Sequence, residues 1–174
     1  IIGLALVLFL IDKKSEEIKQ KRIEDQFPYI GELHWNHMPL TYDYNSICEN
    51  LYGGKYVIDI KDGLEYITNK TDYEVAFVKV EKNPDIMFYC HRESVRPRKN
   101  LRESIDTGVA QAYIYEGTNI FSYGEINIYG SNPCLNKKPI LVIHEVLHLL
   151  GLEHNVRPSI SGDIMHPYIT EESC

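Results

Sequence analysis

The chain lacks the features of several common protein classes. Its 174 residues carry a net charge of −7, and this shortage of basic side chains argues against nucleic-acid binding, which usually needs a basic face. No internal repeat and no low-complexity run is visible. Cysteines are few and widely spaced, which excludes the paired Cys-x-x-Cys pattern of small structural zinc sites. The remaining composition, 44% hydrophobic and 25% charged, is typical of one globular domain.

The sequence also lacks an apolar run of about 20 residues, the length that a membrane-spanning helix needs. Its longest apolar run covers residues 1–11. Because the chain does not begin with Met, we expect further residues upstream and interpret residues 1–11 as part of a transmembrane anchor or as the core of a signal peptide. The absence of a small-residue cleavage site favours the anchor, and a buried helix or strand is the alternative.

Residues 12–27 mix both charges densely and contain few apolar side chains, a composition typical of a solvated stalk or linker. We therefore expect the folded domain to span residues 28–174. We expect a membrane-anchored protein with this domain outside the cytoplasm, or alternatively a secreted one. Basic residues follow the apolar run and prefer the cytoplasmic side, so the orientation stays open.

One motif carries most of the functional information. Residues 144–154 have the sequence HEVLHLLGLEH. His144 and His148 are four residues apart, so they lie on one face of a helix and both rings can bind one metal ion. Gly151 suits the left-handed conformation that ends a helix, after which the chain can reverse and bring His154 to the same metal. Three nitrogen ligands leave a fourth position open, which is typical of a catalytic zinc site.

The motif also contains a candidate general base. Glu145 is offset around the helix from His144, so it is poorly placed as a further ligand but can reach a water at the metal. An ordinary pair of helical histidines is the alternative interpretation. That alternative leaves Glu145, Gly151 and His154 unexplained.

At these residues the chain resembles the metzincin clan of zinc endopeptidases. A second segment supports the resemblance, because residues 163–167, with the sequence DIMHP, are similar to the clan's Met-turn. Met165 would then lie beneath the zinc, and an ordinary core methionine is the alternative. Some metzincins place a tyrosine near the zinc just after this methionine. Tyr168 is the matching residue, but Pro167 alters the spacing and favours a packing role.

The resemblance implies a specific chemistry. Zn²⁺ would be bound by His144, His148 and His154, and Glu145 would be the catalytic residue that takes a proton from the attacking water. Peptides or proteins would be the substrates. In metzincins the fourth strand pairs with substrate backbone, and residues 110–115 match it, although an ordinary edge strand is the alternative. A zinc-binding module without turnover is the alternative function.

Hydrophobic periodicity predicts the order of the elements. Strands are expected at residues 38–42, 73–80, 85–90, 109–115 and 125–129. Between the first two, a helix presents one apolar face composed of Val57, Ile60, Leu64 and Ile67. The histidine helix follows Pro139 with an expected buried stripe of Ile140, Ile143, Leu147 and Leu150. The predicted class is α+β, a twisted mixed sheet of about five strands with a backing helix and a zinc-binding helix.

This order is similar to that of matrixin-like metzincin domains, which implies a zincin fold over about residues 31–168. The sequence departs from matrixins at Asn155, where they usually carry Ser, and it shows no calcium-loop or cysteine-switch pattern. The family's C-terminal helix would be short or truncated after Thr170. The four cysteines Cys48, Cys90, Cys134 and Cys174 allow three pairings. Two disulfides are expected, and buried free thiols are the alternative.

Overall fold

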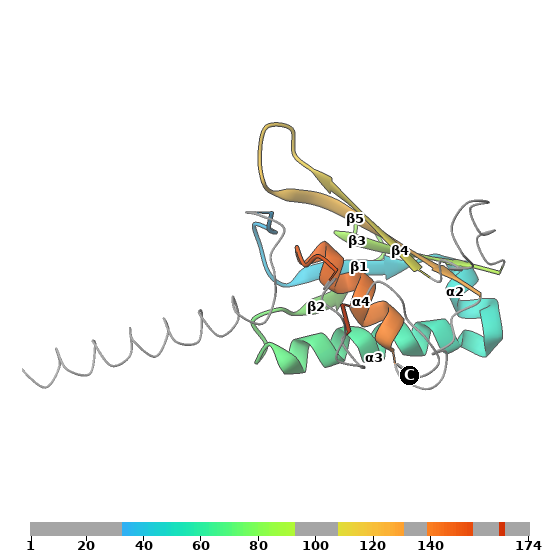
Figure 1. The fold of residues 1–174 in the computed structure, drawn as a ribbon. Helices are drawn as coiled ribbons and strands as arrows, with labels where there is room; N and C mark the ends of the chain where they lie inside the picture. Colours follow the sequence, from blue (N-terminus) through green and yellow to red (C-terminus); the bar gives the residue numbers. More distant parts are fainter. Residues whose placement is uncertain (1–32, 93–107, 131–138, 155–163, 166–174) are drawn as a thin grey trace, which may run out of the picture.

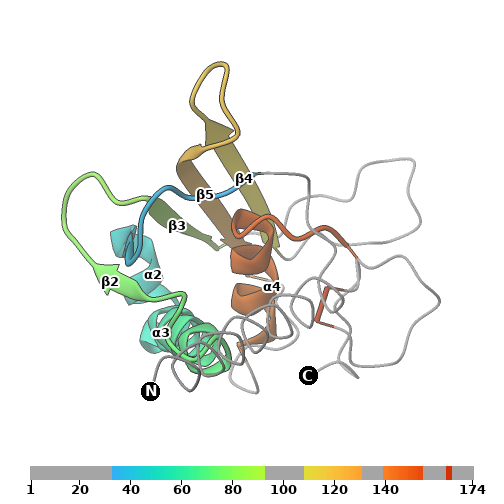
Figure 2. The ribbon, with the colours of Figure 1, turned by 90° about the vertical axis from the view of Figure 1, so that its left-hand side faces the viewer.

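The computed structural model describes residues 33–92, 108–130, 139–154 and 164–165. In these residues a five-stranded mixed sheet is backed on one face by the helices α3 and α4, which lie side by side (Figures 1 and 2). The order of elements is one strand, three helical segments, four strands and a final helix. This confirms the predicted α+β class. The predicted segments at residues 1–11 and 12–27 lie outside the described residues, as does Tyr168.

The sheet places its only antiparallel strand at one edge. Its spatial order is β2 (Phe77–Lys79), β1 (Leu40–Tyr44), β3 (Ile86–His91), β5 (Phe121–Tyr129) and β4 (Gly108–Ile114). The first four run parallel, and β4 pairs antiparallel with β5. β3 pairs with β5 only from Gly124 onward, so the β4–β5 hairpin extends beyond the rest of the sheet (Figure 1).

The long helix α3 (Lys55–Lys70) packs under the parallel strands. Its buried apolar residues include Ile60, Leu64 and Ile67, and Val57 is partly buried, as the sequence predicted. They join one core cluster with Phe88 of β3 and the inward side chains of β5. The core is therefore a single layer between the sheet and the two helices.

The helix α4 (Ile140–Leu149) packs against glycines of its neighbours. A Cβ at Gly63 of α3 would lie 2.8 Å from Cγ1 of Val142, and one at Gly124 of β5 would lie 2.6 Å from Cδ1 of Leu149. Such distances are too short for a real side chain, so both positions need glycine for this packing. The close packing fixes α4 between α3 and the sheet.

The predicted buried stripe of α4 is only part of the surface that this helix buries. Ile143 is buried, but Ile140, Leu147 and Leu150 are only partly buried. The fully buried apolar residues are instead Leu141, Val142, Val146 and Leu149. A single stripe assumes one neighbour, whereas α4 contacts α3 on one side and β4 and β5 on another.

The predicted strand at residues 73–80 is too long. β2 contains only Phe77–Lys79, and Tyr73 has a left-handed backbone with φ 67°. The hydroxyl of Thr71 donates to the carbonyl oxygen of Ile67 at 3.0 Å and accepts from the N–H of Val75 at 3.2 Å. The chain uses residues 71–76 to turn out of α3 before it joins the sheet.

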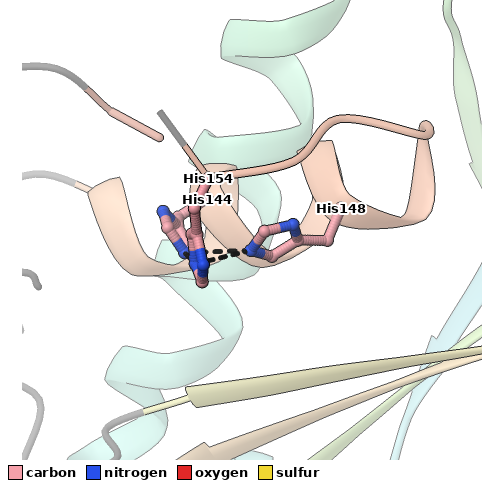
Figure 3. A group of neighbouring side chains, drawn as sticks. All are labelled: His144, His148 and His154. Atoms are coloured by element: carbon pink, nitrogen blue, oxygen red, sulfur yellow. Dashed lines mark hydrogen bonds between the residues drawn. The ribbon is translucent and has the colours of Figure 1, made fainter. Parts of the chain in front are cut away.

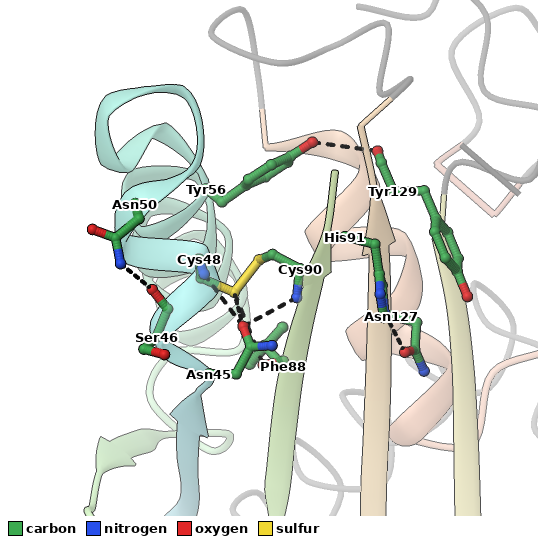
Figure 4. The surroundings of a disulfide bond; sticks show 10 residues. All are labelled: Asn45, Ser46, Cys48, Asn50, Tyr56, Phe88, Cys90, His91, Asn127 and Tyr129. Carbon is green, nitrogen blue, oxygen red and sulfur yellow. Dashed lines mark hydrogen bonds between the residues drawn. A yellow bond between two sulfur atoms is a disulfide. The ribbon is translucent and has the colours of Figure 1, made fainter. Parts of the chain in front are cut away.

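The short helix α2 (Ser46–Asn50) and the following 3-10 turn η1 (Leu51–Gly54) were not predicted. A disulfide joins Cys48 of α2 to Cys90 of β3, and both residues are fully buried (Figure 4). One predicted disulfide is thus present. Cys134 and Cys174 lie outside the described residues. Among the residues that are described, no helix is long and apolar enough to cross a membrane.

Candidate metal centre

Three histidine rings converge at the C-terminal end of α4. The Nε2 atoms of His144, His148 and His154 are each 3.1 Å from the other two, so they form a nearly equilateral triangle (Figure 3). His144 and His148 lie on α4, and His154 comes from the segment that follows the helix. All three predicted ligands are brought together, and their arrangement could hold a metal ion.

The second ring nitrogens define the tautomers of two of these histidines. Nδ1 of His144 donates to the carbonyl oxygen of Ile164 at 2.6 Å, and Nδ1 of His148 donates to that of Leu152 at 2.7 Å. A carbonyl can only accept, so in each neutral ring Nε2 carries a lone pair. Two lone pairs that face each other at 3.1 Å repel unless a cation lies between them. Backbone carbonyls commonly orient metal-binding histidines in this way.

A Schellman motif ends α4 and directs His154 to the site. The N–H of Gly151 donates to the carbonyl oxygen of His148, and the N–H of Leu152 donates to that of Leu147, both at 3.0 Å. Gly151 has φ 88°, a left-handed conformation that favours glycine. The predicted reversal of the chain at Gly151 is confirmed.

The turn at residues 164–165 contacts the first ligand. Ile164 supplies the carbonyl oxygen that accepts from His144, and the next residue, Met165, is buried with 3% of its surface exposed. Both residues lie in a turn. The arrangement ties the segment predicted as a Met-turn to α4, although most of that segment lies outside the described residues.

The predicted general base is buried beside the edge strand. Glu145 is only 5% exposed. A Cβ at Gly108, the first residue of β4, would lie 2.7 Å from Oε1 of Glu145 and 2.8 Å from Cδ1 of Leu141. At this point β4 faces the carboxylate with a residue that has no side chain. Gly108 is therefore a site residue that the sequence did not reveal. Its only signal was a glycine directly before a predicted strand.

A second polar cluster lies next to the segment that leads into β1. Oδ2 of Asp85 accepts from the N–H and the hydroxyl of Thr41, both at 2.7 Å, and lies 3.0 Å from Nε2 of His37. Burial raises the pKa of Asp85, but the hydrogen bonds from Thr41 and His37 outweigh it and hold this pKa below its usual value. These contacts fix the backbone on either side of Pro39.

One cavity of about 330 Å³ lies apart from the histidines. It is bordered by α2 and by the end of β3, beside the disulfide of Figure 4, and its lining includes Ser46, Leu51 and His91. None of the three converging histidines borders it. The chemistry at α4 is therefore separate from this cavity.

No known protein family matches the chain, and no curated protein matches it significantly. The functional argument therefore rests on the geometry of the site itself.

Proposed function

We propose that the protein is a zinc-dependent endopeptidase with a metzincin-like fold and active site. The observation that carries the proposal is the convergence of three histidine Nε2 atoms at 3.1 Å, with the buried Glu145 directly after the first of these histidines on α4. A ligand set without a neighbouring base would suit a purely structural ion equally well. A buried carboxylate on the residue that follows the first ligand supports a hydrolytic role.

The donor set fits zinc. Zinc binds imidazole nitrogen at about 2.0–2.1 Å in tetrahedral geometry, which separates ligand nitrogens by about 3.3 Å. The observed separations of 3.1 Å are close to this value. The Nδ1 hydrogen bonds of His144 and His148 select the tautomer whose Nε2 carries the lone pair when the ring is neutral, which is the form that zinc requires. Within the described residues the group contains three ligands, the number that is typical of a catalytic ion.

The residues of the chain then have distinct roles in hydrolysis. A bound zinc ion supplies a Lewis acid that lowers the pKa of water to about 7 and polarises a carbonyl group. The carboxylate of Glu145 takes a proton from the water that attacks the scissile carbonyl carbon. It then delivers that proton to the amine nitrogen as the C–N bond breaks, so each turnover returns Glu145 to its ionised form.

The edge strand β4 supports a peptide as the substrate. β4 ends the sheet beyond β5, and its outer side chains are mostly exposed along Val109–Ile114. An extended peptide can pair with such an edge through its own backbone. Because Gly108 of this strand touches Glu145, a peptide paired there would pass next to the carboxylate.

The disulfide supports a location outside the cytoplasm. Disulfides such as Cys48–Cys90 persist mainly in oxidising compartments. We propose that the domain works there, either anchored through the N-terminal segment or secreted.

A peptide-cleavage assay tests the proposal. The purified chain is incubated with a library of quenched fluorescent peptides, with and without a chelator, and zinc is then restored. We expect cleavage that the chelator abolishes and that stoichiometric zinc restores. Zinc binding without cleavage of any peptide would favour the alternative, a binding module without turnover, and would contradict the proposed function.

A further inference from the structure

We propose that Trp35 is a positioning residue for the metal centre, because its indole N–H secures the last turn of α4. The inference rests on the metal-binding half of the proposed function and does not depend on peptide hydrolysis. Trp35 lies 114 positions away from the residue that it contacts. It is the only tryptophan of the chain.

The hydrogen bond from Trp35 satisfies a carbonyl group at the end of α4 that has no donor within the helix. A helix ends with carbonyl groups that have no partner in the helix, and a Schellman motif satisfies only some of them. Here the motif uses the carbonyls of Leu147 and His148. Nε1 of Trp35 donates to the next one, that of Leu149, at 2.7 Å in a buried position. The hydrogen bond thus fixes the turn at the residue directly after a metal ligand.

Trp35 is itself held firmly, so it can fix the helix. It is only 8% exposed, and its ring lies 5.4 Å from that of Phe121, the first residue of β5 after the loop of the β4–β5 hairpin. The backbone of the preceding residue, His34, accepts from the N–H of Phe121 at 2.9 Å and donates to the carbonyl of Asn119 at 3.0 Å. Two residues later, His37 contacts Asp85. The indole is therefore anchored to the sheet on both sides along the chain.

The last turn of α4 also orients His148. Nδ1 of His148 donates to the carbonyl of Leu152, which lies within the same Schellman turn. If Leu149 lost its donor, this turn would loosen, and both His148 and the approach to His154 would lose their fixed direction. Loss of groups that orient metal ligands typically lowers metal affinity by about 10–100-fold.

The test compares Trp35→Phe with Tyr56→Phe. The first removes the indole N–H but keeps an aromatic ring. The second is a matched control, because it also removes a donor to a backbone carbonyl, that of Tyr129 at 3.3 Å, in a different part of the sheet. Zinc affinity is measured by competition with a chromophoric chelator. The visible spectrum of the cobalt-substituted protein reports ligand geometry, and urea unfolding of the chelated proteins reports stability.

We expect Trp35→Phe to lower zinc affinity by roughly tenfold or more and to alter the cobalt spectrum. Tyr56→Phe should leave both unchanged even where it lowers stability. A Trp35→Phe protein with the wild-type affinity and spectrum would overturn the inference and leave the proposed function standing. A wild-type protein that binds no zinc would overturn both.

A second measurement needs no variant. One tryptophan gives one indole N–H resonance in the wild-type protein. Because coupling between two sites is reciprocal, zinc binding should strengthen the contact with Leu149. Zinc should therefore shift this resonance and slow its exchange with deuterium, and chelation should reverse both effects. An indole resonance that does not respond to zinc would overturn the inference even if Trp35→Phe fails to fold.

Discussion

At the scale of single residues, the position of the Glu145 carboxylate depends on a neighbour that has no side chain. Gly108→Ala would place a Cβ only 2.7 Å from Oε1 of Glu145, which is too close for an unstrained contact. We expect the carboxylate to be displaced and peptide cleavage to fall by roughly 10–100-fold, the cost of a small misplacement of a catalytic group. Zinc affinity should stay the same, because the ligands are not touched.

Gly63→Ala is the control for this prediction. Its Cβ would press on Val142 of the same helix, at 2.8 Å, without reaching Glu145. The prediction is contradicted if both variants lose the same fraction of activity. In that case the effect would come from a general shift of α4.

A buried carboxylate in α3 predicts an unusual dependence of stability on pH. Asp59 is 6% exposed, and its buried Oδ2 has no hydrogen-bond partner among the residues that the structure describes. Burial, with a smaller contribution from Asp62, raises the pKa of Asp59 from 3.8 to about 6. Because the folded-state value is the higher one, the folded protein binds a proton between pH of about 4 and 6 that the unfolded chain does not bind. Asp59 therefore favours folding below pH 4 and disfavours it above pH 6.

The prediction is that Asp59→Asn removes this dependence. Relative to wild type, the variant should gain stability as the pH rises from 4 to 7, by on the order of 1–3 kcal/mol. Urea unfolding of both chelated proteins at a series of pH values measures the difference, and the contributions of shared histidines cancel. Parallel pH profiles for the two proteins would show that Asp59 has an ordinary pKa.

Single residues also show what sequence reasoning can and cannot find. His144, His148 and His154 could be predicted as a group because helical periodicity and one glycine bring them together over 11 positions of sequence. Trp35 and Gly108 could not be predicted as site residues, since each contacts α4 only through the tertiary fold. Their contacts depend on where the sheet edge and the segment before β1 pass over the helix.

At the scale of elements, the end of α4 is the part on which the metal site depends most. Gly151 adopts φ 88°, where a residue with a Cβ is strained by about 1–2 kcal/mol. Gly151→Ala should therefore loosen the Schellman turn, misdirect His154 and lower zinc affinity by roughly tenfold. Gly151→Asn should lose less zinc affinity than Gly151→Ala, because Asn tolerates the left-handed region better than Ala. Competition with a chelator measures the zinc affinity of both variants. Equal affinities for the wild type and the two variants would contradict the role of this turn.

The elements themselves were predictable where one periodicity dominates. Hydrophobic periodicity predicts the buried face of α3, and it places β3 and β4 to within a residue or two. The full burial of α4 did not follow from periodicity, because the helix is covered from two sides and seven of its ten residues are apolar. The start of β2 was missed because Thr71 caps α3 through side-chain hydrogen bonds, which a count of β-branched residues does not detect.

At the scale of the whole molecule, the disulfide ties the α2 region to the centre of the sheet. Cys48 and Cys90 close a loop with a sequence separation of 42, for which the chain-entropy model gives about 4 kcal/mol. The double variant Cys48→Ala, Cys90→Ala should lower the free energy of unfolding by about 2–4 kcal/mol. Zinc affinity should be retained, since neither cysteine contacts the histidines. Urea unfolding checks the prediction, and a loss below about 1 kcal/mol would contradict it.

The strand order of the molecule lay beyond sequence reasoning. Periodicity predicted a strand, a helix and four more strands, but it gave no reason to place β1 between β2 and β3, or to put β4 outside β5. Among the described strands, that order puts β4 at the edge of the sheet, where its Gly108 faces Glu145. The pairing of Cys48 with Cys90, one of three possible partners for Cys48, was likewise decided by the fold.

The most direct test of the central claim is peptide turnover by Glu145→Gln at a zinc content equal to that of wild type. Glutamine keeps the shape of the side chain but cannot accept the proton. We expect the variant to bind one zinc ion per chain with wild-type affinity and to lose at least about 100-fold in turnover, the contribution of a general base. A zinc-loaded Glu145→Gln protein that cleaves peptides at the wild-type rate would contradict the proposed function.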